Sequence, residues 1–161
     1  MDTVYIETSV VSHATAWPSK NPAIAALQAQ AKQWLESESP NFRLVTSQFV
    51  IDEVSRGDPD AAKRRLAVLE NVGLLLPDPD VESLAEKIVA GCMMPQTAKL
   101  DALHVASAVL ADVDYLLTQN CRHIANATEL PRLYRLLEDL KLPRILVCTP
   151  IQFLGDPEND M

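Results

Sequence analysis

Glycine is scarce in this chain, and its scarcity excludes two large classes of nucleotide-binding enzyme. The 161 residues include 4 glycines, and all of them are isolated from one another. A Rossmann dehydrogenase or a P-loop enzyme needs clustered glycines, because the backbone must approach the phosphates closely. Neither kind of phosphate cradle can be placed in this sequence.

Cysteine is also sparse, which argues against a disulfide framework and against a structural zinc site. The 3 cysteines, Cys92, Cys121 and Cys148, lie far apart, and none belongs to a CxxC pair. Disulfide-rich domains carry paired cysteines, and zinc sites use closely spaced ones. We therefore predict reduced and mostly buried thiols.

Long apolar runs and an excess of positive charge are missing as well. The longest runs fall short of the roughly 20 residues that a membrane span needs, and the first residues lack the features of a signal peptide. We therefore expect a cytoplasmic protein that does not contact a membrane. With 14 Lys and Arg against 22 Asp and Glu, the net charge is −8. This balance disfavours a general nucleic-acid binder, but it permits an enzyme that binds RNA through metal.

What the chain does contain is enough apolar sequence, 48%, for one folded domain. We assign residues 1–155 to a single domain and residues 156–161 to a short acidic C-terminal tail. Short β-prone runs alternate with helical segments, which predicts an α/β fold: a three-layer αβα sandwich with a mostly parallel central sheet. The expected strands are residues 4–6, 42–46, 74–76, 114–118 and 145–148, and the expected helices are 23–36, 48–56, 59–65, 80–90, 99–111 and 129–140.

Polar residues at the carboxyl ends of these strands are candidate ligands, because parallel α/β sheets bind ligands there. Glu7 follows the first strand, and Asn120 follows the strand at residues 114–118. Glu7 could instead be an ordinary solvent-facing acid, and Asn120 could cap a short helix. Arg122 and His123, next to Asn120, offer a cation and a possible acid or base.

Two further acids are predicted to point inward from helices. At about 100° per residue, Glu53 falls inside the apolar arc of its helix, whereas Asp52 faces solvent. A buried carboxylate needs a partner, either a shared cation or a salt bridge such as one to Arg56. Asp101 begins a helix that is apolar almost all round, where it shares a face with His104. Asp101 could also serve only the helix dipole, and His104 could be a hydrogen-bonded core histidine.

One shared cation explains these three acids from separate segments better than three unrelated roles do. Mg²⁺ and Mn²⁺ prefer such oxygen ligands. We therefore predict that Glu7, Glu53 and Asp101 converge within metal-bridging range, with Asn120 alongside.

Four segments, read together, resemble PIN domains and in particular VapC-type toxin ribonucleases. The segments are YIETSV (5–10), FVIDEVSRG (49–57), KLDALHVASA (99–108) and YLLTQNCRHIAN (115–126). The resemblance spans roughly residues 2–150. It implies a metal-dependent ribonuclease in which Glu7, Glu53 and Asp101 hold Mg²⁺ or Mn²⁺, with Asn120 where many relatives carry a fourth acid.

The resemblance also implies partners and two alternative functions. The first is an endoribonuclease that is the toxin of a type II toxin–antitoxin pair, with an RNA substrate, a small antitoxin protein as partner and a homodimer built on the early helices. The second is a weak or inactive PIN-fold module that binds RNA or protein, because an amide at Asn120 adds no charge. Candidate RNA contacts are Thr8, Ser9, Lys99, Arg122 and His123. The run at residues 63–65 could also contact RNA phosphates, although a solvated helix face is the simpler interpretation of it.

Overall fold

A five-stranded parallel sheet forms the centre of the protein, as the alternating pattern predicted. The computed structural model describes residues 1–92 and 94–154, so the predicted acidic tail at 156–161 lies outside the described residues. The strand order is β3-β2-β1-β4-β5, and every pairing is parallel. The strands are β1 (Thr3–Ile6), β2 (Arg43–Thr46), β3 (Gly73–Leu74), β4 (Tyr115–Leu117) and β5 (Leu146–Cys148).

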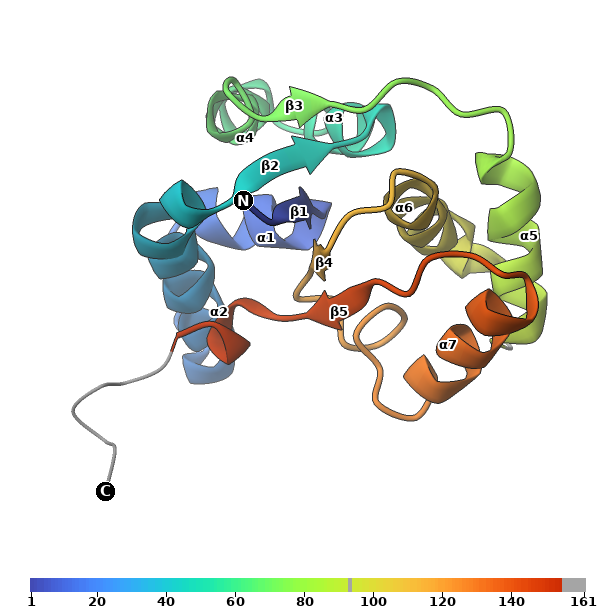
Figure 1. Ribbon diagram of the computed structural model, residues 1–161. Coiled ribbons are helices and arrows are strands. Elements are labelled where there is room, and N and C mark those ends of the chain that lie inside the picture. The colour runs from blue at the N-terminus through green and yellow to red at the C-terminus, as the bar shows by residue number, and fades with distance from the viewer. Residues whose placement is uncertain (93, 155–161) are drawn as a thin grey trace.

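Helices cover both faces of this sheet, which gives the predicted three-layer sandwich. In Figure 1, α2 lies on one face, and α5, α6 and α7 lie on the other. Among the described residues, no helix is both long enough and apolar enough to cross a membrane. The helices are α1 (Thr8–Thr15), α2 (Pro22–Gln33), α3 (Gln48–Val54), α4 (Pro59–Val68), α5 (Val81–Gly91), α6 (Lys99–Leu110) and α7 (Leu130–Asp139), and a π-helix (Trp34–Glu38) and 3₁₀ turns (Ser39–Asn41, Gln96–Ala98, Pro150–Gln152) complete the set.

Local sequence signals explain where several helices begin and end. Asn21 caps α2 through its side chain, with Pro22 at the first helical position, and Asp58 and Pro59 begin α4 in the same way. Gly57 ends the segment after α3 with a φ of 85°, a backbone conformation that favours glycine.

Two features differ from the sequence-based expectation. Helix α1 was not predicted, because its cap is a glutamate, Glu7, which is not one of the usual capping residues. The run at 74–76 was expected to be a buried strand, but β3 ends at Leu74, and Leu76 is 89% exposed. Pro77 follows, and β3 is an edge strand with no neighbour on its outer side among the described residues, so the run lacks the second neighbour that would bury it.

Candidate metal centre

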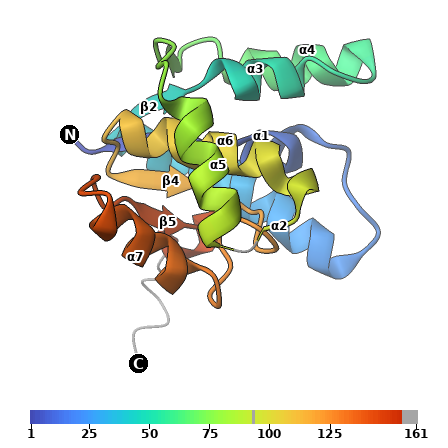
Figure 2. The ribbon, with the colours of Figure 1, turned by 90° about the vertical axis from the view of Figure 1, so that its right-hand side faces the viewer.

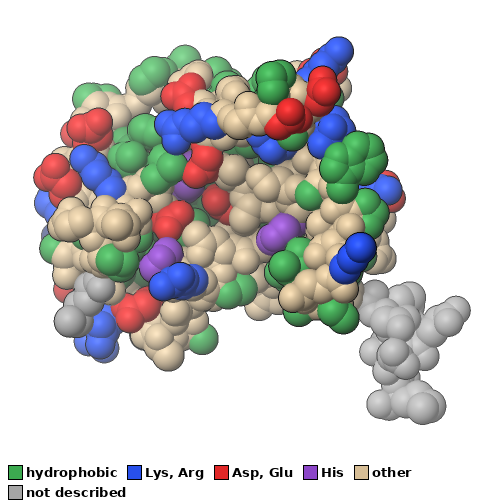
Figure 3. Space-filling view, turned by 180° about the vertical axis from the view of Figure 1, so that it is seen from behind, with side chains coloured by type: hydrophobic (Ala, Val, Ile, Leu, Met, Phe, Trp, Pro, Cys, Tyr) green, Lys and Arg blue, Asp and Glu red, His purple; other side chains and the backbone are tan. Residues whose placement is uncertain are grey.

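The candidate site lies at the carboxyl ends of β1 and β4, the two central strands. The Glu7 N–H donates to the Leu117 carbonyl at 3.1 Å, so the backbone after β1 continues the pairing with β4. Figure 2 shows β4 and β5 running toward the side of the molecule on which α1 lies. Figure 3 looks onto that side, where acidic side chains and histidines gather around a hollow near its middle, with Lys and Arg farther out.

Glu7 is held rigidly because its carboxylate caps helix α1. Its Oε2 accepts hydrogen bonds from the Ser9 N–H (3.0 Å) and the Thr118 hydroxyl (2.8 Å), and from the Ser9 hydroxyl. The residue is only 3% exposed, and among the described residues it forms no ion pair with Lys or Arg. All these bonds end on Oε2, which leaves Oε1 for a ligand.

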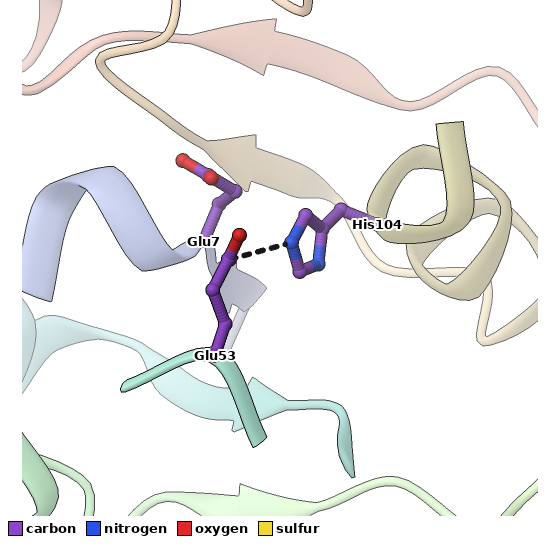
Figure 4. Close-up of side chains that lie close together, drawn as sticks. All are labelled: Glu7, Glu53 and His104. Carbon is purple, nitrogen blue, oxygen red and sulfur yellow. Dashed lines mark hydrogen bonds and ion pairs between the residues drawn. The ribbon is translucent and has the colours of Figure 1, made fainter. Parts of the chain in front are cut away.

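Glu53 reaches the site from α3 and pairs with a histidine of α6. Its Oε1 lies 3.1 Å from His104 Nε2, and its side chain is 28% exposed. Figure 4 shows the Glu53 carboxylate between the Glu7 side chain and the imidazole. Burial acts to raise the pKa of Glu53, but the hydrogen bond from His104, the nearby Thr8 hydroxyl and the charge of Arg56 lower that pKa below its usual value.

His104 itself belongs to a buried chain of hydrogen bonds. Its Nδ1 lies 3.1 Å from the Tyr5 hydroxyl, which lies 2.6 Å from the Ser47 hydroxyl. A carboxylate only accepts, so Nε2 carries the proton that bonds Glu53, and the Nδ1 of a neutral ring accepts from Tyr5. Burial raises the pKa of Tyr5, so the phenol keeps its proton for this bond. The sequence-based alternative of a hydrogen-bonded core histidine is therefore confirmed.

Ligand atoms of Glu7, Glu53 and His104 all lie within 4.8 Å of one another. In the hydrogen-bonded arrangement both His104 nitrogens are occupied, so the imidazole orients Glu53 and the two carboxylates are the groups that could hold a metal ion. Two ionised carboxylates at this distance, here those of Glu7 and Glu53, repel each other by about a few kcal/mol at an effective dielectric of about 20. A cation between them removes that repulsion.

Asp101 lies next to this cluster, in the first turn of α6, without belonging to the group within 4.8 Å. Burial is the main cause that raises its pKa, and the negative charge of Glu53 adds to it. His123, His104 and the Asn120 amide oppose that rise. Asp101 is thus a half-buried carboxylate at the edge of the Glu7–Glu53 pair.

Asn120 serves the backbone of the loop after β4. Its Oδ1 accepts from the His123 N–H at 3.0 Å, and its carbonyl accepts from the N–H groups of Ile124 and Ala125. This is the capping role considered from the sequence, although it closes a turn and not a helix. The Asn120 amide also lowers the pKa of Asp101, so the side chain links the loop to the acidic cluster.

The residues predicted to contact RNA differ in exposure and in whether their side chains are already hydrogen-bonded. Lys99 and Arg122 are exposed, and His123 is half-buried. The Ser9 hydroxyl already forms two hydrogen bonds: it donates to the Glu7 carboxylate, and it accepts from the Gln119 N–H at 2.8 Å. The Thr8 hydroxyl is buried without a hydrogen-bond partner among the described residues, so it is available to a ligand at the site.

Several supporting residues were not identified from the sequence. Thr118 was read only as the end of a strand, yet its hydroxyl binds Glu7, and the neighbouring Gln119 side chain bonds His13 Nδ1 and the Leu27 carbonyl. Tyr5 was read only as a strand residue. Polar residues at the ends of apolar strands were the available signal, but the pairing of β1 with β4 is needed to bring them together.

Comparisons with known proteins support the fold. No protein-family model matches the sequence, and a search of curated proteins found no match. Among solved structures, the fold is similar to that of VapBC-1 from nontypeable Haemophilus influenzae, with a TM-score of 0.55 and 15% sequence identity. The alignment covers 92% of this chain and 98% of that chain. The chain therefore shares an α/β fold with VapBC-1 along nearly its whole length.

Proposed function

We propose that this protein is a metal-dependent endoribonuclease that hydrolyses phosphodiester bonds of RNA. The observation that carries the proposal is the convergence of Glu7 and Glu53 from two elements at the carboxyl ends of the central strands. Asp101 beside them supplies a third carboxylate, and the motif resemblance to VapC-type toxins points to the same chemistry.

The residues present fit a divalent cation of the Mg²⁺ or Mn²⁺ kind. The donors are hard oxygen atoms, as these ions prefer: a free Oε1 on Glu7, the Glu53 carboxylate and, at the rim, Asp101. The Thr8 hydroxyl, which lies near Glu53 but forms no full hydrogen bond among the described residues, is a further oxygen at the site. When bound, the metal supplies an activated water and stabilises charge on the scissile phosphate.

The chain's own contribution is to fix the carboxylates before substrate arrives. Ser9 and Thr118 hold Glu7, and His104 holds Glu53, so each charged oxygen is oriented by neighbours that cannot easily move. Such supporting hydrogen bonds raise metal affinity by keeping the ligand geometry. His123 lies close enough to Asp101 to affect its pKa, and its imidazole could bind a phosphate oxygen of the RNA beside that carboxylate.

Titration of Mn²⁺ by calorimetry, together with cleavage of single-stranded RNA, tests the proposal. We expect wild-type protein to bind Mn²⁺ and cleave RNA, with cleavage lost in chelator. Asp101→Asn should weaken both, while raising the Tm of the metal-free protein, because burial disfavours the charged form of Asp101. The matched control is Asp60→Asn, since Asp60 is an exposed acid in the first turn of α4. Equal losses in both variants would contradict a dedicated site.

The second candidate, a weak or inactive module that binds RNA or protein, is favoured by one observation. Asn120 uses its Oδ1 for the His123 N–H, so the place of a fourth acid holds an uncharged, occupied group. If the wild-type protein binds RNA without Mn²⁺ and does not cleave it, the result would favour this candidate.

Replacing Asn120 with Asp should raise Mn²⁺ affinity about tenfold or more. An added carboxylate contributes Coulomb attraction of about a few kcal/mol at an effective dielectric near 20, before desolvation is subtracted. The capping bond to His123 survives, because Asp accepts as Asn does, while repulsion from Asp101 lowers the stability of the metal-free protein. Asn126→Asp is the control, since Asn126 bonds the Thr128 N–H in the same way. Equal dissociation constants in wild type and Asn120→Asp would remove Asn120 from the site.

We further propose that the protein is the toxin of a type II toxin–antitoxin pair, with a small antitoxin protein as partner, and that it forms a homodimer. The shared fold with VapBC-1 and the motif resemblance support the pairing, and an adjacent reading frame for a small DNA-binding protein would test it. For the dimer, exposed Ile24 on α2 agrees with an interface on the early helices. A monomer in sedimentation at micromolar concentration would contradict the dimer.

A further inference from the structure

One of the two tryptophans is displayed on the surface. Trp17, in the loop between α1 and α2, is 77% exposed, whereas Trp34 is fully buried in an aromatic cluster with Phe42 and Phe153. Large aromatic side chains are usually covered, because their burial stabilises the fold. An exposed indole therefore has no evident part in the core.

The exposed indole is nevertheless held in position. The Arg64 guanidinium, from α4, lies 4.9 Å from the centre of the Trp17 ring, and Arg64 Nε donates to the Thr15 carbonyl at 3.4 Å. The Gln28 side chain donates to the Trp17 carbonyl at 3.1 Å and accepts from the Ser19 N–H at 2.9 Å. These contacts tie the loop to α2 and α4. Arg64 occupies one face of the indole, and the high exposure shows that much of the ring remains open.

Trp17 and the candidate metal centre lie at opposite ends of helix α1. Glu7 caps the start of α1, and Trp17 follows the end of the same eight-residue helix. At about 1.5 Å per residue, the eight residues of α1 alone span roughly 12 Å, so an RNA strand that reaches both sites has to cover at least about three to four stacked nucleotides at 3.4 Å each. Arg64, exposed Lys63 and exposed Arg56 lie on the neighbouring α3–α4 side, among the exposed acids Asp52, Asp58 and Asp60.

We propose that Trp17 and Arg64 form a subsite for an unpaired nucleotide of single-stranded RNA, a proposal that rests on the ribonuclease function above. The open ring stacks on a base, and the cations near it contact phosphates. Stacking on aromatic side chains is how proteins bind unpaired bases, and it requires no particular base identity. Because the overall charge is −8, the open indole with Arg64 against it gives the chain a point of attachment for RNA that does not depend on a basic surface.

Intrinsic fluorescence tests the subsite directly, since Trp34 is buried and Trp17 is the exposed emitter. A single-stranded RNA oligonucleotide, added in Ca²⁺, should quench the exposed component of wild-type emission. Trp17→Leu should weaken RNA binding by about 5- to 150-fold, the range for one stacked base, and Trp17→Phe should weaken it less. The control is Leu76→Ala, because Leu76 is also highly exposed but lines a separate groove along β3 and α5.

Several outcomes would overturn the subsite while leaving the proposed function standing. Trp17→Leu is expected to keep the wild-type Tm and the wild-type Mn²⁺ affinity, because Trp17 contacts neither the core nor the carboxylates. Unchanged emission at saturating RNA, or equal RNA affinity in wild type and Trp17→Leu, would overturn the proposal. Emission that changes with protein concentration and not with RNA would assign Trp17 to a protein interface. Failure of Mn²⁺ to bind the wild type would instead count against the ribonuclease itself.

Discussion

Replacement of Glu53 by Gln is expected to lower Mn²⁺ affinity by about 100-fold or more and to abolish RNA cleavage. Gln keeps the length of the side chain, and its oxygen can still accept from His104 Nε2, so the fold is preserved. What disappears is one of the two negative charges that would draw a cation into the site, where the ligand atoms of Glu7 and Glu53 lie within 4.8 Å of each other. Loss of an orienting partner alone typically costs 10–100-fold in metal affinity, and loss of a charged ligand costs more.

The neighbouring Asp52 provides a matched control for this result. Asp52 is on the same helix and carries the same charge, but it is exposed and bonds the Gln48 side chain at 2.8 Å. Asp52→Asn should leave Mn²⁺ affinity and cleavage at wild-type levels. A similar loss in both variants would mean that the overall charge governs binding, and the assignment of Glu53 as a ligand would be wrong. Calorimetry of both proteins at equal ionic strength makes the comparison.

Replacement of His104 by Leu should affect both stability and metal binding. Leu fills much of the same volume, but the Tyr5 hydroxyl and Glu53 lose a buried partner, which typically costs about 1–3 kcal/mol. Glu53 is then free to rotate, and Mn²⁺ affinity should fall about 10- to 100-fold. Urea unfolding and calorimetric titration measure the two effects separately.

The pH dependence of metal binding distinguishes positioning by His104 from a merely structural role. The hydrogen bond from His104 lowers the Glu53 pKa, so its removal raises that pKa. Mn²⁺ binds the ionised carboxylate. As the pH is lowered, His104→Leu should therefore lose Mn²⁺ binding at a higher pH than the wild type does. In the wild type, the depressed Glu53 pKa stabilises the fold above the ordinary pKa of glutamate, about 4.3, and this stabilisation is lost as the pH falls through the lower folded value. His104→Gln, which can still donate to Glu53, should restore much of the affinity. Equal pH midpoints in wild type and His104→Leu would contradict positioning.

Much of the site was predictable because the strand ends and helix phases carry the information. Glu7 could be placed at the crevice from its position after β1, and the phase of α3 correctly separated inward Glu53 from exposed Asp52. Asp101 and His104 share a helix with almost no other polar residue, which marked them both. These inferences need only local periodicity.

The remaining features depend on which strands are neighbours, and local patterns do not specify that. β1 lies between β2 and β4, so Tyr5 reaches both Ser47 and His104, and Glu7 reaches Thr118. Each of these contacts joins residues at least 42 positions apart. The edge position of β3 likewise decides that Leu74 and Leu76 are exposed, although their apolar run resembles a buried strand.

The central place of β1 has a consequence for synthesis of the chain. Thr118, which binds the Glu7 carboxylate, is 111 residues downstream of it, a stretch that a ribosome takes on the order of 10 s to make at about 5–20 residues per second. Until β4 emerges, one edge of β1 has no partner and Glu7 lacks its Thr118 hydroxyl, and the α6 residues of the cluster are made only shortly before β4. A nascent or prematurely terminated chain therefore carries the first acid without a working site. Any nuclease activity would begin only after about three quarters of the 161 residues have been made, which keeps the translating ribosome and its message away from an active centre during most of elongation.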